Sequence, residues 1–365
     1  MVDQKSLTKA ARKSFPDVAA TEREVSRTIE KLNTRSPSEV AELSTIHRPR
    51  TETPTAESME MEIMRPGVTP DAAIKPLLES GRDGLRKATE GKLLSPRESM
   101  GVEAIVLLFG RPALLVQDDE IGTPPQEWSN LTSKKAMLKK IIPSIGRIEL
   151  ENHHTYPWVG TGFLVGDGVV MTNRHVAEVF AKKKGAKWSF TPPVKGRIDY
   201  KEEYQRDKAR EFRLTDILHV DNRYDMALLK VSKKGLKAEE SPVPLTVASS
   251  APASIKNRQI AVIGYPAYDS RNVEQEMLRI FENIFNVKRF APGEMTRLAS
   301  RDGLKILEHD CSTLGGNSGS CVIDLETGNV LGLHFGGQYL VGNVCVPLWT
   351  LTRQKELKAA KVNFA

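Results

Sequence analysis

The stretch Cys311–Ile323 reads C-S-T-L-G-G-N-S-G-S-C-V-I and surrounds one serine, Ser318, with small residues. Gly315, Gly316 and Gly319 permit a tight turn in which backbone N–H groups point at one spot. A turn of this kind builds a backbone oxyanion hole beside a nucleophilic serine. Because clusters of glycine, serine and asparagine usually form ordinary turns, the stretch becomes a catalytic hypothesis only with support from elsewhere in the chain.

A candidate base lies upstream, in the run W-V-G-T-G-F-L-V-G-D-G-V-V-M-T-N-R-H-V-A from Trp158 to Ala177. The pattern predicts two strands joined by a Gly-Asp-Gly turn, followed by a short helix that begins near His175. A single histidine is more often a surface or core residue, so the serine turn downstream is what favours a catalytic interpretation of His175.

A candidate acid lies between them, in D-N-R-Y-D-M-A-L-L-K-V from Asp221 to Val231. Asp225 precedes a predicted buried strand, so its carboxylate is expected to need a partner such as a histidine N–H. The alternative is an aspartate that only ends a turn. The chain order His175, Asp225, Ser318 supplies the base, the orienting acid and the nucleophile of acyl transfer. Activity is expected to rise with pH as His175 loses its proton.

The 365 residues are 39% hydrophobic and 27% charged, which is ordinary for a soluble protein. No run approaches the roughly 18 apolar residues of a membrane span, and the basic N-terminus lacks the apolar core of a secretory signal. We therefore expect a cytoplasmic protein that does not bind membranes. Its three cysteines, Cys311, Cys321 and Cys345, are expected to be reduced thiols, with Cys321 buried in a strand.

The net charge of +7 includes two lysine-rich runs, at 134–140 and 182–187. Neither is accompanied by a nucleic-acid-binding motif or interleaved aromatic residues, so solvated faces are expected rather than a nucleic-acid site. His153 and His154 are adjacent in a loop-like stretch, and no CxxC or HExxH spacing supports a zinc site. We expect no metal and no cofactor.

Three regions differ in composition. Residues 1–66 are polar and punctuated by proline, which predicts a flexible segment with one possible helix. Residues 67–129 predict a small helical unit with a strand-like exit, and residues 130–365 contain short β-rich runs typical of a sandwich or barrel. The predicted strands of this last region are Gly146–Leu150, Thr161–Val165, Val169–Thr172, Ile217–Val220, Met226–Val231, Gln259–Gly264, Cys321–Asp324 and Val330–His334.

The motifs T-N-R-H-V-A, Y-D-M-A-L-L and G-G-N-S-G-S resemble those of trypsin-like (chymotrypsin-fold) serine peptidases, over about residues 145 to 355. The resemblance implies a mainly β fold of two packed six-stranded antiparallel β-barrels, with the site in the cleft between them, preceded here by a small helical N-terminal region. It implies His175 as general base and acid, Asp225 as its orienting partner and Ser318 as nucleophile. It also implies an oxyanion hole made by the N–H groups of Gly316 and Ser318.

Two further motifs are similar to those of bacterial glutamyl endopeptidases: S-T-L-G-G-N-S-G-S from Ser312 to Ser320, and G-L-H-F-G-G from Gly332 to Gly337. This resemblance implies that Thr313 and His334 line the specificity pocket, where a hydroxyl and an imidazole can donate to an acidic side chain. Ser312, at the pocket position six residues before the nucleophile, offers no carboxylate to pair with Lys or Arg.

We therefore expect a serine endopeptidase that cleaves protein or peptide substrates through an acyl-enzyme, with a preference for acidic residues as a hypothesis. Cys321 departs from the proline usual in the glutamyl group, and those secreted enzymes have a trimmed N-terminus where this chain keeps a long N-terminal part. That part is a regulatory adaptor that recruits a protein partner, an inhibitory segment, or a structural extension of the barrel that packs through residues 103–116. The alternative function is a peptidase-fold binding module that has lost catalysis.

Overall fold

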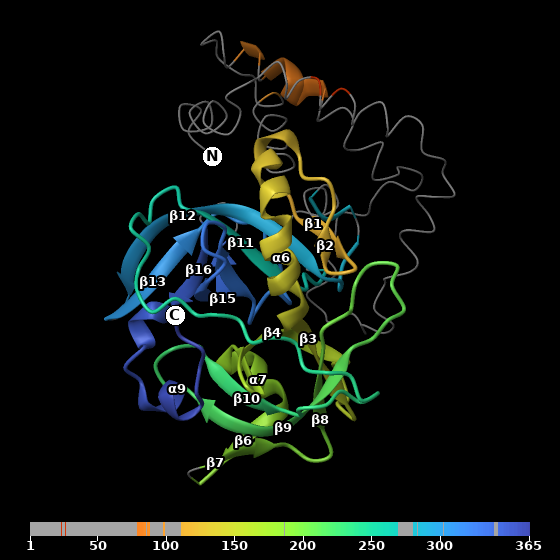
Figure 1. Ribbon diagram of the computed structural model, residues 1–365, viewed down its shortest axis with the longest axis vertical. Coiled ribbons are helices and arrows are strands. Elements are labelled where there is room, and N and C mark those ends of the chain that lie inside the picture. Colours follow the sequence, from red (N-terminus) through yellow and green to blue (C-terminus); the bar gives the residue numbers. More distant parts are fainter. Residues whose placement is uncertain are drawn as a thin grey trace, which may run out of the picture. The chain divides into compact units, whose positions relative to one another are not determined.

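The computed structural model describes residues 111–365, apart from 186, 269–279, 283, 302 and 339–341, together with a few positions before residue 111 (Figure 1). The chain divides into two units, of which the larger comprises residues 111–124, 129–269 and 286–365. The described residues of the smaller unit include a helical stretch at 79–84. The boundaries predicted at 66 and 129 stay predictions. Apart from two positions, the helix predicted within residues 1–66 lies outside the described residues, and the stretch at 79–84 falls in the predicted helical unit of residues 67–129.

The first barrel closes in the strand order β10-β5-β4-β3-β8-β9. Apolar side chains on the inner faces of these strands form a core that includes Ile148, Leu164, Phe212 and Leu229, each fully buried. Helix α7 (Arg174–Phe180) and the hairpin of β6 (Ala181–Lys184) and β7 (Lys187–Phe190) separate β5 from β8 in sequence. The barrel strands are β3 (Ile145–Glu151), β4 (Trp158–Gly166), β5 (Val169–Thr172), β8 (Lys195–Asp199), β9 (Glu211–Val220) and β10 (Ala227–Val231).

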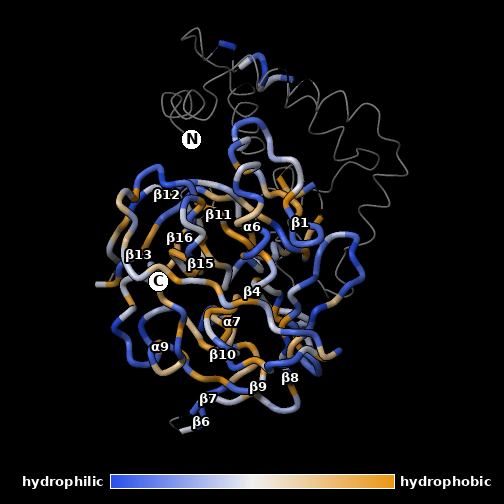
Figure 2. Tube along the Cα trace, in the orientation of Figure 1, coloured by the Kyte–Doolittle hydropathy of each residue, from blue (hydrophilic) through white to orange (hydrophobic). Residues whose placement is uncertain are grey.

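The second barrel runs in the order β11-β14-β15-β16-β13-β12 and closes through pairing of β11 with β12, for example Ile263 with Phe290. Figure 2 shows apolar residues concentrated on the strands of both barrels and polar residues on the loops. The strands of this barrel are β11 (Gln259–Gly264), β12 (Arg289–Arg301), β13 (Leu304–His309), β14 (Cys321–Asp324), β15 (Val330–Gln338) and β16 (Gly342–Pro347).

The segment before the first barrel joins the second one. Strand β1 (Leu114–Gln117) pairs with the start of β12 and turns into β2 (Glu120–Ile121). The chain then reaches β3 through η3 (Gln126–Lys134), α6 (Lys135–Ile141) and η4 (Ile142–Ser144). Of the run 103–116, residues 103–110 lie outside the described residues, and 114–116 belong to β1.

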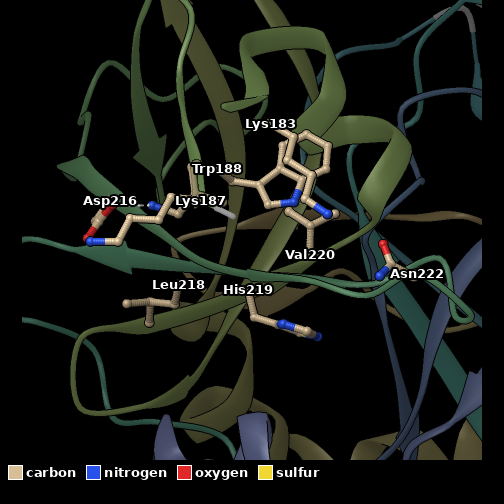
Figure 3. Close-up of a pocket in the computed structure, with 9 residues that line it drawn as sticks. Lys183, Lys187, Trp188, Asp216, Leu218, His219, Val220 and Asn222 are labelled. Atoms are coloured by element: carbon tan, nitrogen blue, oxygen red, sulfur yellow. Dashed lines mark hydrogen bonds between the residues drawn. The ribbon is translucent and has the colours of Figure 1, made fainter. Parts of the chain in front are cut away.

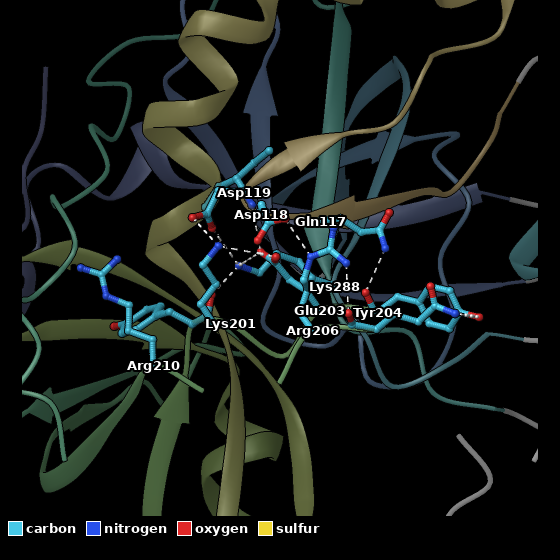
Figure 4. A network of polar contacts seen from close by, with 12 residues as sticks. Gln117, Asp118, Asp119, Lys201, Glu203, Tyr204, Arg206, Arg210 and Lys288 are labelled. Carbon is cyan, nitrogen blue, oxygen red and sulfur yellow. Dashed lines mark hydrogen bonds and ion pairs between the residues drawn. The ribbon is translucent and has the colours of Figure 1, made fainter. Parts of the chain in front are cut away.

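A polar network holds the β1–β2 turn (Figure 4). Lys288, fully buried just before β12, donates to Tyr200 O at 2.6 Å and lies 3.7 Å from Glu203 Oε1 and 3.9 Å from Asp119 Oδ1. Lys201 Nζ is 2.6 Å from Asp119 Oδ2. Burial lowers the pKa of Lys288 to about 8, against the neighbouring carboxylates, which raise it. The turn is therefore tied to the loop after β8 and to the start of β12.

The C-terminal segment returns to the first barrel. After η5 (Leu348–Leu351) and α9 (Lys355–Ala359), Asn363 N–H donates to Val165 O at 2.7 Å. Val247 then exchanges backbone hydrogen bonds of 2.8 Å with this tail, donating to Asn363 O and accepting from the Ala365 N–H. The end of the chain therefore links the linker between the barrels to strand β4.

These observations confirm the predicted mainly β fold of two antiparallel six-stranded barrels. Each of the eight predicted strands overlaps an observed one. The three cysteines are free thiols, as expected, and all three are buried, whereas burial was predicted only for Cys321. Burial raises the pKa of Cys321. Among the described residues, no helix is long and apolar enough to span a membrane.

Candidate active site

The side chains predicted as base and acid are in contact. His175 is the second residue of α7, and Asp225 lies in the turn before β10. Asp225 Oδ1 accepts the His175 backbone N–H at 3.0 Å, and Asp225 Oδ2 lies 2.6 Å from His175 Nδ1. Because an ionised carboxylate only accepts hydrogen bonds, Nδ1 carries the ring proton and Nε2 keeps its lone pair. The imidazole is thus oriented as a proton acceptor.

The acid is more exposed than its sequence context predicted. The exposed fraction of the side chain is 27% for Asp225 and 48% for His175. Asp225 therefore needs no partner on grounds of burial alone. Its position is instead fixed by the two hydrogen bonds from His175 and by Asn173 Nδ2, which donates to Asp225 O at 2.8 Å.

Asp221 organises the turn that presents Asp225. Its Oδ1 accepts the N–H groups of Arg223 at 2.7 Å and Tyr224 at 2.8 Å, and its own N–H donates to Met226 O at 2.9 Å. This is the local side-chain to backbone pattern by which aspartate fixes a turn. The carboxylate of Asp225 consequently extends from a rigid support.

The predicted nucleophile, Ser318, lies in the turn before β14. Gly316 and Gly319 in this turn have φ values of +83° and +87°, a conformation that favours glycine. A Cβ atom on Gly316 would come 2.6 Å from Trp158 Cη2, and one on Gly319 would collide with Thr161 O. The turn thus requires glycine at both positions.

Thr161, on strand β4 of the first barrel, holds this turn. Its N–H donates to Ser318 O at 2.9 Å, and its Oγ1 donates to Gly316 O at 2.9 Å. The same Oγ1 accepts the Tyr265 N–H at 3.2 Å, while Thr172 Oγ1 donates to Thr161 O at 2.7 Å. The backbone around Ser318 is therefore fixed by a strand from the other barrel.

The backbone N–H groups of Gly316 and Ser318 are the predicted oxyanion donors. Within the described part of the chain, neither has a hydrogen-bond acceptor, whereas the amides of Asn317 and Gly319 both donate to carbonyl oxygens. Since backbone N–H groups in folded proteins are nearly always paired, two unpaired donors one residue apart form a site for an acceptor oxygen.

Two predicted pocket residues have partners within the chain. Ser312 Oγ donates to Arg111 O at 2.7 Å, and Thr313 Oγ1 donates to Asn343 Oδ1 at 2.7 Å. Each hydroxyl has a single proton, so in this arrangement both are acceptors toward any further group. Of the two predicted donors to an acidic substrate side chain, Thr313 and His334, only the His334 imidazole remains available.

His334 on β15 is 2% exposed and adjoins the serine turn. Gly319 N–H donates to His334 O at 3.1 Å, and His334 N–H donates to Ser320 O at 2.9 Å. Burial holds the pKa of His334 well below its usual value, and the nearby His309 and His175 lower it further. His334 is therefore neutral.

A second buried histidine fixes the tautomer of the first. His309 Nε2 lies 3.2 Å from His334 Nδ1, and burial lowers the pKa of His309 to about 3. Among the described residues the buried His309 Nδ1 has no partner. A lone pair is less costly to leave unpaired than an N–H, so His309 Nε2 carries the proton and donates it to His334 Nδ1. The proton of His334 consequently lies on Nε2.

Within the described part of the chain, one group of carboxylates is close enough to share a metal ion: Glu149, Asp199 and Glu202. Arg147 Nη2 lies 2.6 Å from Glu149 Oε1, and Arg197 Nη2 lies 2.7 Å from Glu149 Oε2. Arg147 also pairs with Glu202 at 3.3 Å. These guanidinium groups pair with Glu149 and Glu202, while Asp199 Oδ1 accepts the N–H groups of Lys201 at 2.8 Å and Arg210 at 2.9 Å. The three carboxylates thus belong to a structural polar network.

The adjacent histidines His153 and His154 stack with ring centroids 4.9 Å apart. His153 Nδ1 accepts the N–H groups of Thr155 at 3.2 Å and Tyr156 at 3.1 Å. This nitrogen therefore stabilises a loop.

A protein family described as trypsin-like peptidase domain matches residues 160–333. A probable serine protease of Lysobacter enzymogenes is 31% identical over 306 residues, which are 74% of this chain and 79% of the relative. The chain belongs to the trypsin-like peptidases. The peptidase is accordingly a serine endopeptidase, a hydrolase whose substrates are peptides or proteins.

Glutamyl endopeptidases are also similar to the peptidase. That of Staphylococcus epidermidis is 28% identical over 180 residues, which are 49% of this chain and 54% of the relative. That of Staphylococcus aureus is 25% identical over 185 residues, with coverage of 50% and 48%. The chain spans about half the length of these relatives. The crystal structure of the active form of the Rv3671c protease from M. tuberculosis matches with 20% identity and a TM-score of 0.42, over 64% of this chain and 87% of that one.

Sequence reasoning missed several residues that support the site of the peptidase. Asp221 had a local signal, because an aspartate often accepts hydrogen bonds from the backbone N–H groups of the residues that follow it and so fixes a turn. Thr161, Arg111 and His309 had none, because each contacts the site from another strand or segment. Thr161 and Gly316, for example, are 155 positions apart in sequence.

Proposed function

We propose that the peptidase cleaves peptide bonds through His175, Asp225 and Ser318. His175 Nε2 takes the proton of Ser318 Oγ as this oxygen attacks the scissile carbonyl carbon. The N–H groups of Gly316 and Ser318 stabilise the resulting oxyanion. His175 then gives the proton to the leaving amine, and a water molecule, activated by the same imidazole, hydrolyses the acyl-enzyme. Asp225 orients the ring and stabilises its protonated form.

The observation that carries this proposal is the double contact of one carboxylate with one histidine. Asp225 accepts from both the backbone and the ring of His175, which leaves Nε2 as the acceptor. The amides of Gly316 and Ser318, which have no acceptor among the described residues, supply the complementary donors. A binding module without catalysis has no need of either arrangement.

A fluorophosphonate probe tests the assignment. We expect the wild-type chain to be labelled and Ser318→Ala to be unlabelled and inactive. Ser320→Ala is the matched control, because this buried serine lies two positions away and its Oγ has no partner among the described residues. Asp225→Asn is expected to lower kcat by up to about 10⁴-fold through the wrong histidine tautomer. Equal labelling of wild type and Ser318→Ala would mean that another residue is the nucleophile, and no labelling of either would favour the binding module.

We further propose a preference for acidic residues on the amino side of the scissile bond. The similarity to glutamyl endopeptidases supports it, as does the neutral His334, whose Nε2–H can donate to a carboxylate. A panel of peptides that differ only at this residue tests the proposal. Faster cleavage after Glu or Asp than after Gln is expected, and best cleavage after Lys, Arg or large apolar residues would exclude it.

We also propose that the N-terminal region regulates the peptidase, through a protein partner that binds it. Arg111, where the N-terminal part enters the larger unit, supports this, because its carbonyl accepts the Ser312 hydroxyl and its guanidinium lies 2.7 Å from Asp310 Oδ2. The entry point thus contacts the strand end that carries the predicted pocket residues. Deletion of residues 1–100 is expected to change kcat/KM on peptides while the far-ultraviolet circular dichroism remains β-rich. Unchanged activity and solubility would leave this region without a regulatory role.

A further inference from the structure

The first barrel carries a pocket of about 420 Å³ that the proposed mechanism does not use (Figure 3). One wall is the β6–β7 hairpin, and the other is the end of β9 with the turn that follows it. Asp216 and Asn222 lie at opposite ends of the pocket in Figure 3. The lining residues that matter here are Lys183, Lys187 and Trp188 on the hairpin, Asp216 and Leu218 on β9, and Asn222.

Both walls of the pocket lead within a few residues to the base and the acid. Strand β6 follows α7 directly, so five helical steps and three extended steps place Lys183 Cα at most about 18 Å from His175 Cα. Asn222 is three positions before Asp225, which is at most about 11 Å along the chain. An extended peptide covers such distances with about three to six residues. A substrate bound at His175 can therefore reach the pocket.

The β6–β7 hairpin carries several lysines close together, and no carboxylate of the described residues pairs with them. Lys182, Lys183 and Lys184 follow one another on β6, and Lys184 pairs directly with Lys187 on β7. Like charges opposite one another in a sheet are destabilising. Among the described residues, none of these four lysines forms an ion pair, whereas Lys233 pairs with Asp167 at 2.7 Å and Lys201 with Asp119 at 2.6 Å.

The pocket has a single acid and an apolar surface beside the lysines. Asp216 Oδ1 accepts the N–H of Ile217 at 2.9 Å, which engages one of its oxygens with the backbone. Trp188 is half-buried against the core of the first barrel, and Leu218 is 41% exposed. Cationic groups around an aromatic and an aliphatic surface fit a peptide that combines carboxylates with apolar side chains.

We propose that this pocket, the lysine pocket, binds an acidic segment of the substrate three to six residues from the scissile bond. The occupant is the substrate chain itself, because both pocket walls continue into the elements that carry His175 and Asp225. The carboxylates of the segment balance Lys183 and Lys187, and its apolar side chains cover Trp188 and Leu218. Recognition of acidic residues here is separate from any preference at the residue next to the scissile bond.

Matched fluorogenic peptides test the proposal in the full chain. All share one cleaved sequence and carry Asp and Glu, or Asn and Gln, at the third to sixth positions on either side. We expect the acidic flank to raise kcat/KM about tenfold at low salt and the gain to vanish near 1 M salt. The double variant K183Q/K187Q should lose the gain and cleave the amide-flanked peptide as the wild type does. The double variant K233Q/K234Q, on lysines with acidic partners elsewhere, should keep it.

A catalysis-independent measurement separates this proposal from that of the catalytic residues. Fluorescence anisotropy of the labelled acidic peptide is measured with Ser318→Ala and with Ser318→Ala/K183Q/K187Q. About tenfold weaker binding by the second variant supports the lysine pocket even if Ser318 proves not to be the nucleophile. Equal binding and equal flank dependence in all lysine variants would make the hairpin a solvated face and overturn the proposal. An oligonucleotide that the two lysines bind, with no effect on acidic peptides, would overturn it in favour of nucleic acid.

Discussion

Thr161 shows how much of the site depends on a residue that does no chemistry. The Thr161 hydroxyl donates to Gly316 O, and the Thr161 backbone N–H donates to Ser318 O. Those two residues also supply the proposed oxyanion donors. A displacement of Thr161 would therefore also move both N–H groups. A displacement of about 1 Å at a catalytic group can lower the rate about 100-fold.

We predict that Thr161→Val lowers kcat at least about tenfold with little change in KM. Valine keeps the shape but removes the donor to Gly316 O and the acceptor of the Tyr265 N–H. The free energy of unfolding should fall by about 1–3 kcal/mol. Steady-state kinetics and urea unfolding are compared with Thr215→Val, a change on the exposed face of β9. A loss of stability with normal kcat would limit Thr161 to a structural role.

A second prediction concerns His309 as a positioning residue. His309→Leu removes the donor to His334 Nδ1, so His334 can move its proton to that nitrogen and no longer donates reliably from Nε2. We expect KM for a peptide cleaved after Glu to rise several-fold while KM for one cleaved after Gln is unchanged. His309→Gln keeps an amide donor and should restore much of the difference. Equal effects of Leu and Gln on both peptides would show that His309 only fills space.

The motifs proposed to be catalytic were readable from sequence because each residue lies in a contiguous local pattern. His175 follows a strand and begins a helix, and Ser318 lies among glycines that the turn requires. The partners of Ser312 and Thr313 were not readable, because Arg111 and Asn343 lie 201 and 30 positions away. Only the fold brings such residues together, and no local rule predicts the contact.

At the scale of elements, the turn before β14 combines two left-handed glycines with a strand from the other barrel. The hydrogen bond from Gly319 N–H to His334 O on β15 helps to stabilise the left-handed conformation of Gly319. The turn, β4 and β15 therefore form one unit.

We predict that Gly319→Ala abolishes activity and lowers the free energy of unfolding by about 2 kcal/mol or more. The new Cβ meets Thr161 O and Thr172 Oγ1, and the positive φ adds strain. Gly122→Ala is the matched control, since nothing lies within 4 Å of a Cβ there. Kinetics and thermal unfolding of both variants test this. A stable and active Gly319→Ala would mean that the turn adapts, so its geometry would not define the donors.

Most of the predicted strands contain a short apolar run, whereas several strands of mixed composition were not predicted. Strand β12 contains Pro292 and Gly293, which interrupt the pattern, yet it continues through both to pair with β11. Strand β8 reads K-G-R-I-D, where alternation is short and three residues are charged. Its arginine is held by carboxylates on neighbouring strands, including Glu149 and Glu211. These strands depend on tertiary pairing, which exceeds their intrinsic preference.

At the scale of the whole molecule, buried charge makes stability depend on pH. Lys288 has a pKa near 8 in the folded chain against an ordinary value of 10.5. The unfolded chain therefore binds the proton more tightly. The stabilisation linked to this group is full above about pH 10.5 and is lost as the pH falls through 8.

We predict that the free energy of unfolding of the wild type rises relative to that of Lys288→Met between pH 7.5 and 10.5. The difference should grow by up to about 3 kcal/mol, on top of a constant loss from the hydrogen bond to Tyr200 O. Urea unfolding of both proteins across this range measures the difference. Parallel curves would show that Lys288 titrates in the folded chain as it does in the unfolded chain.

The return of the C-terminal tail has a practical consequence. The linker between the barrels is exposed at residues 249–251, and a cut there separates His175 and Asp225 from Ser318. The later fragment would still carry the tail that hydrogen-bonds Val165 and Val247, together with the turn that Thr161 holds. The two halves are therefore suited to fragment complementation. If the proposed triad is correct, we expect each half to be inactive alone and proteolytic activity to appear when the halves associate.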